Sequence, residues 1–155
     1  MTNAIREQVL AILQNDWATY IERFHHLPME AQAIFLAEQG YRRLADLLAH
    51  VVAWWMEGSR FIENLLLDPD IGSQDYDVDD FNAQAVSCVS DLDETAVAKS
   101  YEAMRQRMLV LAMSLPEAAF ENRRIVERFQ MEVIGHLAEH ALPESTVQVP
   151  DNSLS

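Results

Sequence analysis

The stretch RLADLLAHVVAWWMEGSRF, residues 43–61, decides the fold class. Its apolar residues recur every three or four positions, as they do on one side of an amphipathic helix. Pro69 and Gly72 follow as helix-ending signals, so the pattern predicts a helix over about 41–67. The predicted apolar stripe consists of Leu44, Leu48, Val51, Trp55 and Ile62.

The same periodicity predicts three more long helices, over about 3–25, 91–116 and 122–142. We expect a loop over 26–40, and an acidic connection from residue 68 that leads to a short helix near 79–90. Asp79 or Asp80 would cap the short helix, while Asp91 and Glu94 fit a capping box for the next long one. The expected fold is therefore all-α, a four-helix bundle with long connections and one short extra helix.

The length of 155 residues predicts one domain, which we place at 1–143. The last residues, 144–155, lack periodicity and are expected to form a flexible tail. A net charge of −14 with only 11 Lys and Arg argues against binding to nucleic acid or to an anionic membrane surface. The single cysteine, Cys88, excludes a disulfide within the chain, and no signal peptide or membrane-length apolar run is visible, so we expect a cytoplasmic protein.

Two histidines lie one turn apart in EVIGHLAEHALPE, residues 132–144. On a helical wheel with about 100° per residue, His136 and His140 both fall within the apolar stripe, beside Phe129 and Val133. The charged residues of this helix fall mostly on other faces; they are Arg123, Arg124, Glu127, Arg128 and Glu139. Imidazoles at positions i and i+4 can reach one metal ion. Because a protonated imidazole cannot bind a metal, we expect binding to weaken below a pH of about 6.

The alternative to metal binding is that the two histidines occur at this spacing by chance and complement the helix dipole. Two observations favour a metal: an unpaired imidazole is costly on a buried face, and His50 offers a third ligand from the helix at 41–67. His50 shares a face with Trp54 and Glu57, which we regard as candidate pocket or supporting residues. His25 and His26 precede a turn and are expected to be exposed.

These motifs resemble the DinB/YfiT-like superfamily of bacterial four-helix bundles. The likeness rests on DLLAHVVAW, on the H-x-x-x-H near the end of the last helix and on DVDDFNAQAV, and it covers about 5–143. LLAHVVAWW and DFN also resemble the ClbS/DfsB branch, which is linked to protection against a genotoxic metabolite.

The resemblance implies a divalent metal, zinc or nickel, held by His50, His136 and His140. It also implies a homodimer and a small-molecule substrate, in some members a low-molecular-weight thiol. Two functions follow as expectations. The first is a metal-dependent enzyme that transfers a thiol or hydrolyses a small molecule. The second is a non-catalytic small-molecule-binding or stress-protection protein of the same fold.

Overall fold

The computed structural model describes residues 3–144, and within this range the chain forms helices and no strand. The prediction of an all-α protein is therefore confirmed. The flexible tail predicted at 144–155 lies outside the described residues, apart from Glu144. None of the helices in the described range combines the length and the apolar character that a membrane crossing needs.

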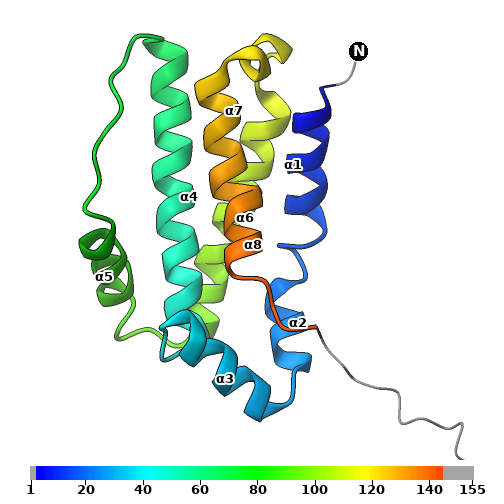
Figure 1. Ribbon diagram of the computed structural model, residues 1–155, viewed down its shortest axis with the longest axis vertical. Coiled ribbons are helices and arrows are strands. Elements are labelled where there is room, and N and C mark those ends of the chain that lie inside the picture. The colour runs from blue at the N-terminus through cyan, green and yellow to red at the C-terminus, as the bar shows by residue number, and fades with distance from the viewer. Residues whose placement is uncertain (1–2, 145–155) are drawn as a thin grey trace, which may run out of the picture.

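Four helical segments lie side by side along the long axis of the molecule (Figure 1). They are α1 (Ala4–Gln14), α4 (Leu44–Leu67), α6 (Glu94–Ser114) and the last segment, which comprises α7 (Arg123–Phe129), η2 (Gln130–Gly135) and α8 (His136–Glu139). Helix α6 packs on α1 and α4, and the last segment packs on α1 and α4. The largest side chains that this arrangement buries are Trp17, Trp55, Tyr20, Tyr101 and Phe129.

The shorter helices lie around one end of these segments and beside α4 (Figure 1). They are α2 (Tyr20–His26), α3 (Met29–Gln39) and α5 (Val78–Cys88), and the 3₁₀ turn η1 (Glu117–Glu121) precedes α7. The side chain of Asp77 caps α5 and that of Asp93 caps α6. The sequence prediction placed both caps on neighbouring acidic residues and was wrong by two or three positions.

Two predictions about the first forty residues were wrong. The helix expected over 3–25 is interrupted between α1 and α2, where Trp17 turns fully into the core. The loop expected over 26–40 is instead helix α3, which ends at Gly40 with a φ of 81°. Only Phe35 of α3 is buried, so this helix lacks the wide apolar stripe that reveals a helix in a sequence.

The last segment is one continuous helix that changes from α to π geometry over Gln130–Gly135. The indole N–H groups of Trp55 and Trp17 donate to the carbonyl oxygens of Glu132 and Val133, at 2.8 and 2.9 Å. These donors support carbonyls where regular α-helical pairing is broken. A π turn contains one extra residue, so it rotates His136 and His140 back by about 100° relative to an uninterrupted α-helix.

Candidate metal centre

The structure brings together three histidines that are distant in sequence. His50 comes from α4, His136 begins α8, and His140 follows its last turn. One nitrogen from each ring lies within 4.8 Å of the others, a spacing that could hold a metal ion. All three side chains are buried, with exposed fractions of 6%, 6% and 7%.

Asn82 of α5 fixes the ring orientation and the tautomer of His50. The indole N–H of Trp54 donates to Asn82 Oδ1 at 2.7 Å, and an indole nitrogen can only donate. The atom facing both rings is therefore the amide oxygen. His50 Nδ1 lies 2.9 Å from the same oxygen and must donate to it. His50 Nε2 then carries a lone pair in the neutral ring.

Gln39, the last residue of α3, has the equivalent relation to His140. His140 Nδ1 lies 2.6 Å from Gln39 Oε1 and donates a hydrogen bond to it, because an amide oxygen can only accept. The backbone carbonyl of His140 in turn accepts a 2.7 Å hydrogen bond from the hydroxyl of Tyr20. His140 is thus held at both its ring and its backbone, and its Nε2 also carries a lone pair.

These two lone-pair nitrogens face each other. His50 Nε2 and His140 Nε2 are 3.1 Å apart, yet neither has a proton to donate when Nδ1 is the protonated atom. The ring of His136 packs against both of these rings: its centroid is 5.2 Å from that of His50 and 5.7 Å from that of His140. Its Nδ1 is buried without a hydrogen-bond partner among the described residues. A shared cation would resolve this arrangement, because each nitrogen could offer it a lone pair, and imidazole nitrogens are common ligands of divalent metals.

Burial keeps the three rings neutral at physiological pH. Desolvation, together with the neighbouring imidazoles, lowers the pKa of His136 to about 3 and that of His140 to about 4. Burial also lowers the pKa of His50, against the opposing effect of its bond to Asn82. Neutral imidazole is the form that binds a metal, so no proton needs to be displaced at neutral pH.

A cavity of about 480 Å³ adjoins this cluster. Its lining includes Gln39 and Asn82, the two residues that bind the histidine rings, and also Tyr41 and Asp46. The Tyr41 ring lies 5.7 Å from the His50 ring. Burial, with help from Asp46 and Glu139, raises the pKa of Tyr41 to about 12, so its hydroxyl stays protonated. This cavity is large enough for a small organic molecule.

The other residues considered in the sequence analysis lie outside the histidine cluster. Trp54 supports His50 through Asn82, whereas the carboxylate of Glu57 accepts hydrogen bonds from Arg60 and, at 2.7 Å, from the hydroxyl of Tyr76. His25 pairs with Glu94 at the surface, and His26 is exposed, as expected. Sequence reasoning missed Gln39, which it placed in a loop. It singled out DFN, which contains Asn82, only as part of a resemblance.

No family model matches the chain, and no curated protein and no solved structure matches it. The relation to the DinB/YfiT-like superfamily therefore stays a prediction from the sequence motifs.

Proposed function

We propose that this chain is a metal-binding protein of the DinB-like four-helix-bundle type, in which His50, His136 and His140 hold one divalent zinc or nickel ion. The observation that carries the proposal is the pair of Nε2 atoms 3.1 Å apart, both left with lone pairs because both Nδ1 atoms donate to side-chain oxygens. Such outer hydrogen bonds are typical of histidines that bind metals.

The proposed activity is thiol transfer or hydrolysis on a small molecule. His50, His136 and His140 would hold the ion through three nitrogens, and such an ion would supply Lewis acidity toward a water molecule or a thiol at a further position. The chain contributes the rest: Asn82 and Gln39 hold the rings in place, and the adjoining cavity, which Tyr41 also lines, would hold the substrate. The protonated Tyr41 hydroxyl can donate a hydrogen bond to a bound anionic group.

Metal titration by calorimetry tests the site itself. Wild type should bind one equivalent of zinc or nickel, and His136→Ala should lose at least about tenfold in affinity, the lower bound for disturbing even a supporting group. His26→Ala is the matched control, because it removes an exposed histidine outside the cluster, and it should bind like wild type. Equal affinity in His136→Ala and wild type would refute the triad.

Cobalt substitution tests the open position. Cobalt in the site should give a visible spectrum that changes when a low-molecular-weight thiol is added, with a new thiolate-to-cobalt charge-transfer band. A cobalt spectrum that thiols and other small ligands leave unchanged would show a closed site. That result would favour the non-catalytic alternative while leaving the metal centre intact.

A further inference from the structure

Arg128 is a buried cation with two guanidinium nitrogens that lack a hydrogen-bond partner among the described residues. Only 7% of the residue is exposed, and its Nε and Nη2 atoms are buried with no hydrogen-bond partner among the described residues. A buried guanidinium without partners is costly, since its desolvation is not compensated. The wheel analysis placed Arg128 away from the buried face, so its burial was not predicted.

The nearest carboxyl group does not satisfy Arg128. Glu132 Oε1 lies 3.9 Å from Arg128 Nε, which is too long for a hydrogen bond. Burial raises the pKa of Glu132 to about 8 despite the opposing effect of Arg128, so this carboxyl is mostly neutral at pH 7. Arg128 instead lies over aromatic rings, with Cζ 5.2 Å from the centroid of Phe61 and 5.7 Å from that of Tyr76.

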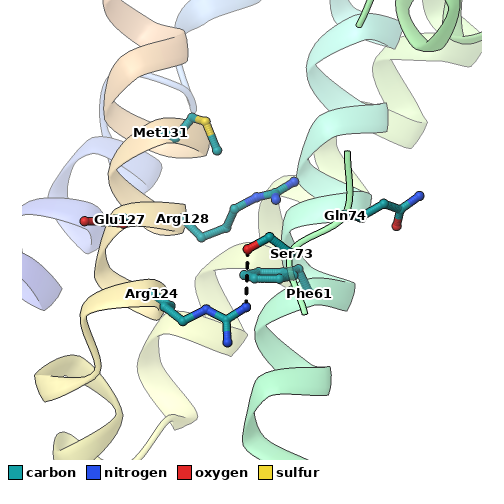
Figure 2. Close-up of a pocket in the computed structure, with 7 residues that line it drawn as sticks. All are labelled: Phe61, Ser73, Gln74, Arg124, Glu127, Arg128 and Met131. Carbon is teal, nitrogen blue, oxygen red and sulfur yellow. Dashed lines mark hydrogen bonds between the residues drawn. The ribbon is translucent and has the colours of Figure 1, made fainter. Parts of the chain in front are cut away.

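Arg128 lines a cavity of about 290 Å³ between α7, α4 and the connection before α5. Figure 2 shows Arg124 and Arg128 extending from α7 toward the same space, with Phe61 and Ser73 between them. Within residues 3–144, the hydrogen bonds of the Arg124 guanidinium are long, 3.4 Å to the Pro69 carbonyl and 3.5 Å to Ser73 Oγ, and its Cζ lies 5.4 Å from the centroid of the Phe61 ring.

The charge balance of this cavity favours an anion. Glu127 also lines it, but Glu127 points away in Figure 2 and accepts a 2.7 Å hydrogen bond from Arg123. Glu57 is likewise occupied by Arg60 and Tyr76. Among the described residues, no carboxylate lies within hydrogen-bonding distance of either cavity guanidinium, in a chain whose net charge is −14.

We propose that this cavity is a second binding site, for a small organic oxyanion. Arg128 and Arg124 would bind the carboxylate or phosphate group, because planar guanidinium groups match these oxyanions with paired hydrogen bonds. Phe61 and Met131 line the same cavity and would contact the apolar part of the ligand. Its volume lies at the lower end of the range for small-molecule sites, about 300–1,000 Å³.

The site is separate from the metal centre and does not depend on it. Arg128 and His136 are eight residues apart on one helix, about 12 Å along its axis. The buried Glu132 lies between them in the sequence. An anion at Arg128 can therefore bind to protein that holds no metal, so the two proposals fail or succeed independently.

Calorimetric titration of the full chain, dialysed free of divalent metal, tests the proposal at constant ionic strength. The probes are benzoate and phenyl phosphate, with benzyl alcohol as the neutral control. Arg128→Met and Arg124→Met each remove one cavity guanidinium, and Arg123→Met is the matched control. Arg123 lies on the same helix, but its side chain is 88% exposed and does not line the cavity.

Wild type and Arg123→Met should bind at least one of the two anions with saturable 1:1 stoichiometry and should not bind the alcohol. Arg128→Met should weaken that binding at least tenfold, and Arg124→Met by a smaller factor. Stronger binding of benzoate would identify a carboxylate site, and stronger binding of phenyl phosphate a phosphate site. No saturable binding of either anion to wild type, or equal loss in Arg123→Met and Arg128→Met, would overturn the proposal.

Discussion

The carboxyl group of Glu132 is buried beside Gly58, with 1% of the residue exposed, and its nearest charged group, Nε of Arg128, is 3.9 Å away. Desolvation raises its pKa from 4.5 to about 8 in the folded protein. The folded chain therefore holds a proton between pH 4.5 and 8 that the unfolded chain releases. By linkage, this carboxyl makes the free energy of unfolding fall as pH rises through that window.

Glu132→Gln should remove this decrease in the free energy of unfolding, because the amide keeps the shape of the carboxyl and cannot ionise. We expect the variant to be close to wild type in stability at pH 5 and more stable at pH 8. The difference in the free energy of unfolding between the variant and wild type should grow by at most about 1.4 kcal/mol per pH unit from pH 5 to pH 8. Urea unfolding at pH 5, 6, 7 and 8 measures it.

The buried histidines change stability with pH in the opposite direction, so their contribution must be distinguished from that of Glu132. Their pKa values are lowered, to about 3 for His136 and about 4 for His140, so the unfolded chain binds the extra protons below pH 6.5. Their effect makes stability rise with pH up to that point. It is common to wild type and Glu132→Gln, so the difference between the two reports Glu132 alone. A difference that stays constant from pH 5 to 8 would contradict a raised pKa.

Single residues could be predicted from the sequence where an apolar stripe surrounds them. His136 and His140 were placed on a buried face because Phe129 and Val133 share it, and both of these are fully buried. Arg128 could not be predicted in the same way, because a charged side chain is ordinarily assigned to an exposed face, whereas here it is buried over the rings of Phe61 and Tyr76.

Helix α4 and the π turn approach each other closely at Gly58. A Cβ atom built on Gly58 would lie 2.8 Å from Cγ of Glu132 and 3.1 Å from its Oε2. Alanine is favoured over glycine inside a helix by about 1 kcal/mol. Overpacking of a buried site costs about 1–3 kcal/mol, and Glu132 is a buried side chain with only 1% of the residue exposed. The packing cost should therefore exceed the gain in helix propensity.

We predict that Gly58→Ala destabilises the protein by about 1–2 kcal/mol. Gly72→Ala is the matched control, because a Cβ at Gly72 would have no atom within 4 Å, and it should change stability by less than about 0.5 kcal/mol. Chemical denaturation of both variants measures the contrast. A more stable Gly58→Ala would show that α4 and the π turn are not in close contact here.

At the scale of elements, the sequence predicted the long helices better than their junctions. Helix α4 was predicted to within three residues because its apolar residues continue at helical spacing along its length, and fourteen of its positions are buried. Helix α3 was missed, although it carries Gln39, because most of it is exposed and it lacks a wide apolar stripe at helical spacing. The π turn was missed because it depends on indole donors from Trp17 and Trp55, which are far away in sequence.

In the whole molecule, the two candidate sites lie at different positions along the last helical segment. The histidine cluster joins α4, α5 and the end of α3, which meet near one end in Figure 1. The arginine cavity lies farther along α4 and α7, beside the connection that leads to α5. Helix α5 and the connection before it thus contribute to both sites: Asn82 to the first, and Ser73 and Gln74 to the second.

Metal binding should raise the stability of the entire fold, because the three ligands come together only in the folded chain. A free zinc concentration of 100 times the dissociation constant should add about 2.7 kcal/mol, which is roughly 5–10 °C in Tm for a chain of this size. His136→Ala should show no such shift. Thermal unfolding of both proteins with and without zinc measures it, and His26→Ala should respond like wild type.

The pH dependence of that shift follows from the lowered pKa values. Free imidazoles would lose their metal below a pH of about 6, but the folded protein keeps His136 and His140 neutral until about pH 3–4. Protons therefore compete with the metal for the folded site only at lower pH. The zinc-induced rise in Tm should persist at pH 5, although the metal-free protein is itself less stable there, since its unfolded histidines take up protons. A zinc response that is already lost at pH 6 would show that the three rings are more exposed to water than their burial in the folded chain indicates.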